Sequence, residues 1–331
     1  MTTTPRSLIA ATGSYLPERV VTNDDLAAFL DTSDAWIRDR TGIGARHVAA
    51  DDEVTSDLAA AASRRALEAA GVSAASLDMI VTATVTPDSP MPACAVRLQH
   101  KLGAGKVPAF DVSAACAGFL FGLTIADQFI RAGGARRVLV VGVELLSRII
   151  DWSDRTTAVL FGDGAGAVLV ERAEPGDPRG IEACRIHSDG SLAAALEIPA
   201  GGSAEPATER GLAARRNKVH MLGQDVFRAA VRGMTDVGQE VVAAAGLTLN
   251  DVDRFVPHQA NLRILQALAE RWAVPLERFV LVLDETGNTS SASIPIALDR
   301  GLSDGRLCRG QRVLMSALGA GVSYGAVLAR L

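Results

Sequence analysis

The sequence predicts an α/β protein built from two related halves, each a mixed β-sheet covered by helices. Three observations predict it: a short segment recurs at a constant offset, each copy joins a helix to a strand, and further strands recur at a similar spacing. With 331 residues, 48% of them hydrophobic, the chain is long enough to bury the core that two such halves need.

The first observation is the repeated segment. EAAGVSAASLDMIV, at residues 68–81, resembles AAAGLTLNDVDRFV, at residues 243–256. The residues that coincide include three pairs: Gly71 with Gly246, Asp78 with Asp253, and Val81 with Val256. An internal repeat constrains the whole architecture, and a chance match of short alanine-rich stretches is the alternative.

The second observation is the order of elements around the repeat. Alanine-rich helices are expected at residues 58–70 and 226–245, and the glycine after each one ends the helix. An apolar run follows each glycine as a buried strand. Both halves therefore contain a helix, a stop and a strand.

The third observation extends the match. RRVLVV, at residues 136–141, corresponds to QRVLMS, at residues 311–316, at the same offset. AFDVSAACAGF, at residues 109–119, loosely matches VLDETGNTSSA, at residues 282–292. The two halves should therefore pack about a pseudo-twofold axis.

The boundary between the halves is predicted in EPGDPRG, which is rich in residues that break helices and strands. The N-terminal half is then residues 1–174 and the C-terminal half residues 175–331. Loops that follow corresponding strands would meet near the axis, where ligands favour strand ends and junctions.

Composition argues against several classes of protein. With 33 basic and 38 acidic residues, a net charge of −5 does not suit a general nucleic-acid binder. Apolar runs fall short of the roughly 18–20 residues that span a bilayer, and MTTTPRSLIAATGSYLPERV lacks the pattern of a signal peptide. Four cysteines without a CxxC pair predict neither a metal site nor disulfides. We expect a soluble cytoplasmic protein that binds neither nucleic acid nor membrane.

Cys116 is a candidate nucleophile. It follows an apolar strand at residues 107–112 and precedes AGFLFGLTIADQFI, which has helical spacing. A helix start stabilises a thiolate and lowers its pKa. The small neighbours, such as Ala115 and Ala117, leave room for a substrate and backbone N–H groups for an oxyanion. A cysteine that only fills the core is the alternative.

Two further polar residues follow predicted strands. His258 comes after the strand at residues 254–256 and begins a predicted helix, where a neutral imidazole can act as a base or a hydrogen-bond donor. Asn288 lies in ETGNTSS. A structural histidine and a turn asparagine are the alternative interpretations.

The three segments together resemble the β-ketoacyl synthase III family of thiolase-fold condensing enzymes. DVSAACAGF carries the family's nucleophile at Cys116, VPHQANLRI its histidine at His258, and ETGNTSSAS its asparagine at Asn288. FGDGAGAVLV, at residues 161–170, and GAGVSYGAVL, at residues 319–328, match its glycine-rich segments. The resemblance implies a thiolase fold, a duplicated five-layer αβαβα arrangement with two mixed sheets, and a homodimer.

The resemblance also implies a decarboxylative Claisen condensation. Cys116 would take an acyl group from a coenzyme A or phosphopantetheine thioester, with the backbone N–H groups of Cys116 and Ala320 as the oxyanion hole. His258 and Asn288 would hold a malonyl-type thioester while it loses carbon dioxide. The reaction could serve either the initiation of fatty-acid synthesis or polyketide biosynthesis, and the sequence does not choose between these two pathways. No cofactor is permanently bound, and acyl carrier protein is the expected partner.

Binding residues follow from the same resemblance. Trp36 and Arg40 in SDAWIRDRTGI and Arg155 in WSDRTT would contact the coenzyme A nucleotide by stacking and phosphate pairing. Arg263 and Arg271 would belong to a positive patch that docks the acidic carrier protein. A helix anchor and solvated surface arginines are the alternatives.

Four substrate-binding positions depart from the family pattern. Gln224, next to Gly223 in HMLGQDVF, stands where asparagine is usual near the pantetheine arm. Leu318 replaces a phenylalanine beside the cysteine, Ala320 replaces a glycine, and Met91 replaces a phenylalanine contributed by the neighbouring subunit. These changes suggest a more open acyl site that admits branched, long or polyketide chains.

Three other classes of protein share part of this pattern of residues. A cysteine protease would usually have a tryptophan after the nucleophile and a secretory context. A non-catalytic ketosynthase partner would have lost the cysteine. An acyltransferase with the same triad and no decarboxylation stays open.

Overall fold

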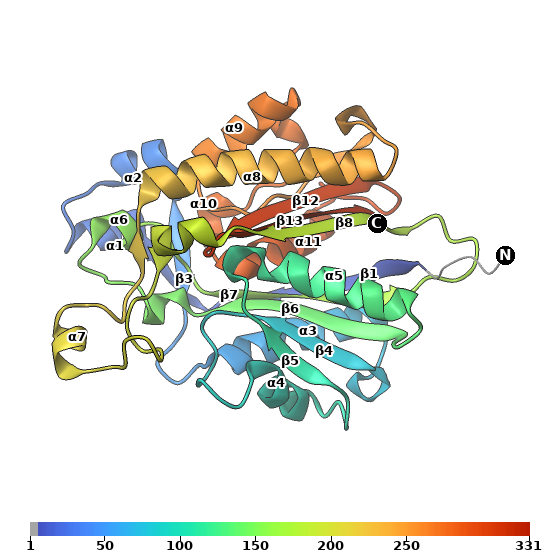
Figure 1. Ribbon diagram of the computed structural model, residues 1–331, viewed down its shortest axis with the longest axis horizontal. Helices are drawn as coiled ribbons and strands as arrows, with labels where there is room; N and C mark the ends of the chain where they lie inside the picture. Colours follow the sequence, from blue (N-terminus) through green and yellow to red (C-terminus); the bar gives the residue numbers. More distant parts are fainter. Residues whose placement is uncertain (1–5) are drawn as a thin grey trace.

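The computed structural model describes residues 6–331, whose helices and strands form five layers (Figure 1). A five-stranded sheet has the order β1-β7-β6-β4-β5, and a four-stranded sheet has the order β11-β12-β13-β8. The first comprises β1 (Ser7–Tyr15), β4 (Met79–Ala83), β5 (Ala109–Val112), β6 (Arg137–Glu144) and β7 (Gly164–Arg172). The second comprises β8 (Gly180–Ser188), β11 (Arg254–Phe255), β12 (Arg312–Gly319) and β13 (Ser323–Arg330). Both sheets are mixed, as predicted.

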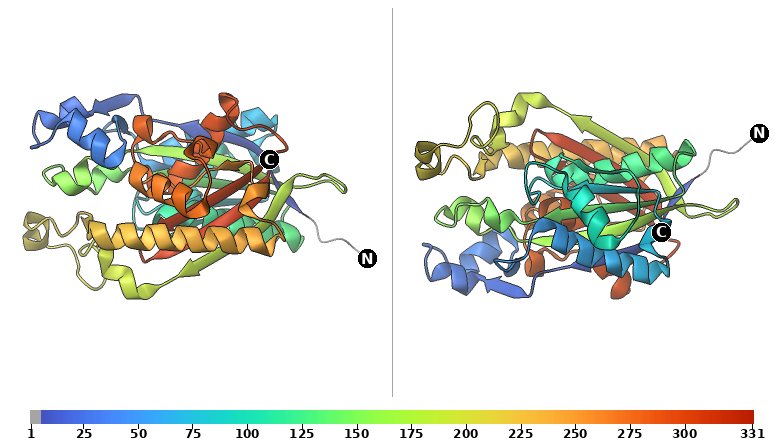
Figure 2. Two further views of the ribbon diagram at one scale, coloured as in Figure 1. Left: turned by 90° about the horizontal axis from the view of Figure 1, so that it is seen from above. Right: turned by 90° about the horizontal axis from the view of Figure 1, so that it is seen from below.

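Helices cover both sheets and fill the space between them. Helices α5 (Gly118–Arg131) and α11 (Ser293–Ser303) lie between the sheets. Figure 2 shows α8 (Gly223–Ala244) over the outer face of the four-stranded sheet, and α3 (Thr55–Ala70) and α4 (Cys94–Leu102) below the five-stranded sheet. The five-layer αβαβα prediction is therefore confirmed.

Shorter elements lie around this framework. Two small antiparallel sheets pair β2 (Arg19–Thr22) with β3 (Ala45–Val48) and β9 (Leu196–Glu197) with β10 (His220–Met221). The other α-helices are α1 (Asn23–Ala27), α2 (Asp34–Thr41), α6 (Arg155–Ala158), α7 (Glu209–Ala213), α9 (Leu262–Trp272) and α10 (Leu283–Thr286). The 3-10 helices are η1 (Ala74–Ser76), η2 (Ala115–Ala117), η3 (Leu146–Arg148), η4 (Gly190–Ala195), η5 (Leu249–Asp251), η6 (Leu276–Arg278) and η7 (Ser290–Ala292).

The internal repeat is visible in matching contacts. Strands β1, β7, β6 and β4 of one sheet occupy the same order as β8, β13, β12 and β11 of the other. The Asp78 carboxylate accepts the backbone N–H of Arg137 at 2.9 Å, and Asp253 accepts that of Arg312 at 2.7 Å. Each repeated aspartate thus binds the start of the central strand that pairs with its own, β6 in one half and β12 in the other.

The central helices carry much of the core and set the location of the site. Phe119, Leu120 and Leu123 on α5 are fully buried, and burying each such side chain contributes about 1.5–3 kcal/mol. The 3-10 turns η2 and η7, which precede α5 and α11, pack against each other. Two corresponding loops of the repeat therefore meet at one place, as the duplication predicted.

The predicted boundary at residues 174–180 falls in the connection from β7 to β8, between the two sheets. Helix α5 contacts strands of both sheets, so the halves share their middle layer. The division into two domains stays a prediction. Within residues 6–331 no helix has both the length and the apolar character that crossing a membrane requires.

Candidate active site

Cys116 lies in a tight turn between β5 and α5. Ala115, just before it, has a φ of +45°, a conformation that is uncommon for a residue other than glycine. Opposite the turn, Gly319 ends β12, and a Cβ atom added there would lie 2.5 Å from the Cys116 backbone nitrogen. The Cys116 side chain is 9% exposed. The turn therefore holds the sulfur at the inner end of a pocket.

The low pKa expected for this thiol is wrong. Burial raises the pKa of Cys116 to about 11, although hydrogen bonding with the Ser290 side chain lowers it in part. Desolvation disfavours the thiolate more than the hydrogen bonds recover. The regular helix also begins only at Gly118, after the 3-10 turn.

His258 lies in the loop between β11 and α9, where it is 3% exposed. Its backbone N–H donates to the Ser316 carbonyl oxygen at 2.8 Å, and its Nδ1 lies 2.7 Å from the Ser293 hydroxyl oxygen. Burial lowers the pKa of His258 to about 3, so the ring is neutral. The predicted helix begins at Leu262 instead of at His258, because Asn261 caps it by accepting the Arg263 N–H.

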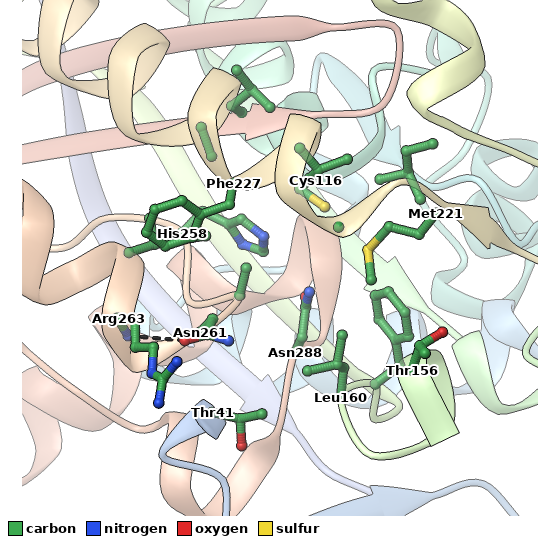
Figure 3. Close-up of a pocket in the computed structure, with 18 of the residues that line it drawn as sticks. Thr41, Cys116, Thr156, Leu160, Met221, Phe227, His258, Asn261, Arg263 and Asn288 are labelled. Atoms are coloured by element: carbon green, nitrogen blue, oxygen red, sulfur yellow. Dashed lines mark hydrogen bonds between the residues drawn. The ribbon is translucent and has the colours of Figure 1, made fainter. Parts of the chain in front are cut away.

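Asn288 lies between α10 and η7 and is 5% exposed. Its backbone N–H donates to the Leu160 carbonyl oxygen at 2.8 Å. Its side-chain Oδ1 accepts the Ser290 N–H at 2.8 Å, which turns the Nδ2 group toward the pocket (Figure 3). Asn288 therefore presents a hydrogen-bond donor to the same space that Cys116 and His258 face.

The pocket has a volume of about 780 Å³. Its inner end brings together the three residues predicted far apart in sequence, Cys116, His258 and Asn288. Its lining also includes the predicted residues Gly223, Gln224, Leu318 and Ala320.

Trp36 forms part of the pocket lining together with four arginines, Arg40, Arg155, Arg228 and Arg263. The guanidinium carbon of Arg155 lies 4.9 Å from the centre of the Trp36 ring, and that of Arg40 lies 5.6 Å from it. A flat aromatic ring beside positive charges suits a ligand that carries a planar base and phosphates.

Two predicted residues do not line this pocket. Met91 is 83% exposed, and Arg271 is exposed on α9. Sequence reasoning also missed lining residues, among them Met221 on β10 and Phe227 on α8. No periodicity in HMLGQDVF distinguishes a pocket-facing side chain from a core one, so no signal in that segment could have found them. Among residues 6–331 no three His, Cys, Asp or Glu side chains gather as a metal-binding group.

Comparison with known proteins identifies the family. Two family models match, the 3-oxoacyl-[acyl-carrier-protein] synthase III model at residues 110–190 and the model of that enzyme's C-terminal part at residues 242–331. The β-ketoacyl-[acyl-carrier-protein] synthase III of Xanthomonas campestris pv. campestris is 50% identical over 327 residues, 98% of each chain. The chain belongs to the β-ketoacyl synthase III family.

Solved structures agree with this assignment. A 3-oxoacyl-[acyl-carrier-protein] synthase III from Aquifex aeolicus is 45% identical with a TM-score of 0.90, covering 98% of this chain and all of its own. The priming β-ketosynthase of the R1128 polyketide pathway is 39% identical with a TM-score of 0.90, covering 99% of this chain and 98% of its own. The predicted thiolase fold is confirmed, and the protein is an acyltransferase of the β-ketoacyl synthase III type.

Proposed function

We propose that this synthase carries an acyl group on Cys116 and joins it to a malonyl-type thioester by decarboxylative Claisen condensation. The assignment of catalytic roles to individual residues rests on one observation about the pocket. A buried thiol, a neutral imidazole and an amide donor, from Cys116, His258 and Asn288, converge on one pocket. These groups match the needs of acyl transfer followed by enolate formation.

Acylation is the first step of the proposed reaction. The Cys116 thiolate attacks the thioester carbonyl carbon, and the thiolate of coenzyme A or of the phosphopantetheine arm leaves. The backbone N–H groups of Cys116 and Ala320 stabilise the oxyanion. The close approach of Gly319 to the Cys116 nitrogen supports this pair, because it brings the turn that contains Ala320 beside Cys116.

Decarboxylation and condensation follow. The malonyl thioester carbonyl accepts hydrogen bonds from His258 Nε2 and Asn288 Nδ2, carbon dioxide leaves, and the resulting enolate attacks the Cys116 thioester. The Ser293 hydroxyl beside Nδ1 supports the tautomer with its proton on Nε2. The low pKa of His258 supports a neutral donor.

Substrates reach this site through the mouth of the pocket. Trp36, Arg40 and Arg155 bind the coenzyme A nucleotide, and Gly223 and Gln224 bind the pantetheine arm. The substrates are acyl-CoA and malonyl thioesters, and the enzyme needs no permanently bound cofactor. The reaction takes place in the cytoplasm.

Acyl carrier protein is the proposed protein partner. Arg263 and Arg271 dock this acidic protein. Arg263 is 48% exposed and lines the pocket mouth, where an acidic partner can reach it.

A homodimer completes the acyl site in this proposal. Strand β5 is an edge of its sheet, and Met91 is almost fully exposed in the single chain. An unpaired edge strand and an exposed apolar side chain both favour association with a second copy. Met91 from that copy then closes the acyl pocket beside Leu318.

A second candidate is a specialised ketosynthase that primes or joins polyketide chains. The similarity to the R1128 priming ketosynthase and the leucine at position 318 favour it. An acyltransferase that uses the triad without decarboxylation is the third candidate.

A panel of acetyl, branched and long-chain thioesters tests the proposal. Mass spectrometry should find the acyl group on Cys116, and Cys116→Ala should abolish it, while Cys184→Ala, outside the pocket, should retain it. Strong preference for acetyl-CoA removes the specialised candidate. Acyl transfer without carbon dioxide release from malonyl thioester contradicts the condensation.

A further inference from the structure

Glu144, the last residue of β6, is a fully buried carboxyl group behind the active site. Its Oε2 accepts a hydrogen bond from the Thr86 hydroxyl at 2.6 Å and from the Val85 N–H at 3.1 Å. Its Oε1 lies 3.2 Å from the Ser290 hydroxyl oxygen and 3.1 Å from that of Ser291. The carboxyl therefore joins the loop after β4 to the turn that follows Asn288.

Ser290 links this carboxyl to the nucleophile. Its hydroxyl donates a hydrogen bond to Glu144 Oε1, and its side chain lowers the pKa of the Cys116 thiol. The turns η7 and η2, which carry Ser290 and Cys116, pack against each other. Ser291 differs, because its hydroxyl also donates to the Ala83 carbonyl oxygen at 2.9 Å, away from the thiol. A hydroxyl that is hydrogen-bonded to a carboxylate, in a turn packed against the turn of the thiol, can pass a proton between the two groups.

The other ionisable groups around Glu144 do not offer this route. The titratable side chains that face it are the Cys94 thiol on α4 and the Cys116 thiol, with Asp88 and Asp111 beyond Cys94. β4, residues 84–86 and η7 carry no titratable side chain.

The two candidate proton acceptors in the site differ in basicity. Burial raises the pKa of Glu144 to about 7, whereas the pKa of His258 is about 3. Near neutral pH the carboxylate is therefore the better acceptor of the thiol proton.

We propose that Glu144 is a positioning residue that holds the thiol proton of Cys116, through Ser290, while Cys116 carries the acyl group. This inference rests on the proposed role of Cys116 as nucleophile. In acylation the Ser290 hydroxyl passes its proton to the Glu144 carboxylate and takes the proton of Cys116. The thiolate then attacks the thioester, and the departing thiolate takes a proton from water at the pocket mouth.

Condensation returns the proton. Loss of carbon dioxide from the malonyl carboxylate leaves an enolate with one negative charge, and its attack on the acyl-enzyme expels the Cys116 thiolate. The thiolate takes a proton from Ser290, which takes one from Glu144. The site is then neutral at sulfur and ionised at Glu144 again, so charge and protons balance over the cycle.

The test is the pH profile of Cys116 alkylation by iodoacetamide in the full-length protein, followed by peptide mass spectrometry. The wild-type rate should rise in two steps, first near pH 7 with Glu144 and again toward pH 11. Glu144→Gln should lose the first step and fall at least tenfold at pH 8. An unchanged or faster rate at pH 8 overturns the proposal, because Glu144 also repels the thiolate and simple removal of its charge favours ionisation.

Ser290→Ala provides an independent test because it leaves the carboxyl in place. It should also lose the first step, and the double variant should be no slower than either single variant. Retention of the first step in Ser290→Ala overturns the relay even if Glu144→Gln does not fold. Ser291→Ala is the matched control, which removes one hydrogen bond to Glu144 and should move the first step without abolishing it.

Alkylation needs no acyl substrate, so this result is separate from the proposed function. An enzyme that is acylated on Cys116 but shows one-step alkylation would contradict only the relay. A protein with two-step alkylation but no acylation would contradict only the proposed function.

Discussion

Gly319 shows how the absence of a side chain shapes the site. An added Cβ would lie 2.5 Å from the Cys116 nitrogen and 2.9 Å from the Ala114 carbonyl oxygen, distances at which backbone atoms have to move apart. Ala320, one residue later, already carries a methyl group in a family position that is usually glycine. Position 320 therefore accommodates a Cβ atom, whereas position 319, directly before it, does not.

Gly319→Ala should lower the rate of Cys116 acylation on the order of a hundredfold, because the oxyanion donors lose their positions. The rate is measured by mass spectrometry with a fixed acyl-CoA. Gly190→Ala is the control, since a Cβ there meets no atom within 4 Å. Equal rates for the two variants would show that the donors do not depend on this close approach.

At the residue scale the sequence predicted Cys116, His258 and Asn288 but not Glu144. Motifs and positions after strands identify the first three residues. The glutamate in VVGVELL belongs to no such motif, and its position indicates only the end of a strand. Its importance depends on the convergence of three loops that are distant in sequence. The low pKa expected for Cys116 was wrong for the same reason, because desolvation is a property of the assembled pocket.

Among the elements, the histidine loop depends on Gln259. This fully buried side chain donates to the Val280 carbonyl oxygen at 2.7 Å, and its Oε1 accepts the N–H groups of Val282 and Leu283 at 2.8 and 3.0 Å. It thereby ties the residue after His258 to the segment that leads into α10 and Asn288.

Gln259→Ala should reduce the free energy of unfolding by about 1–3 kcal/mol for the buried backbone groups left without partners. It should also slow condensation more than acylation, because His258 and Asn288 are less well aligned. Denaturant unfolding and carbon dioxide release measure the two effects. Gln266→Ala, on the exposed side of α9, should change neither, and a similar loss there would argue against the link.

Element ends were predicted unequally. The helix expected at residues 58–70 ends as predicted, because Gly71 adopts a φ of +67° that favours glycine. It begins three residues earlier, at Thr55, after Val54, which is not a usual helix-capping residue. The Asp57 carboxylate accepts the Val54 N–H at 3.2 Å and stabilises this start. A carboxylate that caps a helix by binding the N–H three residues earlier is hard to recognise in the sequence, because the residue at the cap position itself is atypical.

For the whole molecule, the buried histidine links stability to pH. The folded protein keeps His258 neutral down to a pKa of about 3, while the unfolded chain takes up a proton below about 6.5. At this residue the unfolded state therefore binds more protons as the pH falls, so the contribution of His258 to the free energy of unfolding declines, whereas the raised pKa of Glu144 acts in the opposite direction.

Between pH 6.5 and 5 the unfolding free energy of the wild type should fall by about 2 kcal/mol relative to that of His258→Asn, in which the Glu144 contribution is retained. Urea unfolding at several pH values measures it. His100→Asn, exposed on α4, is the control. A difference in unfolding free energy between the wild type and His258→Asn that stays constant across this range would contradict the assignment.

The architecture of the whole molecule could be predicted because the internal repeat is visible in the sequence. The residues that surround the catalytic triad in the pocket could not be predicted in this way. The matching aspartates Asp78 and Asp253 give the same signal twice, so either copy supports the other. Met221 comes from the part between the repeats, and Phe227 lies near the start of α8, where nothing in the repeat marks it as facing the pocket.

The shared middle layer has a consequence for synthesis of the chain. Helix α11 packs against β7 and β1, yet the chain reaches it only long after Arg172, where the second of these strands is completed. While the ribosome adds the intervening residues, the inner face of the first sheet lacks part of its cover. Final assembly of this half, and with it of the active site, must therefore wait until α11 has been synthesised.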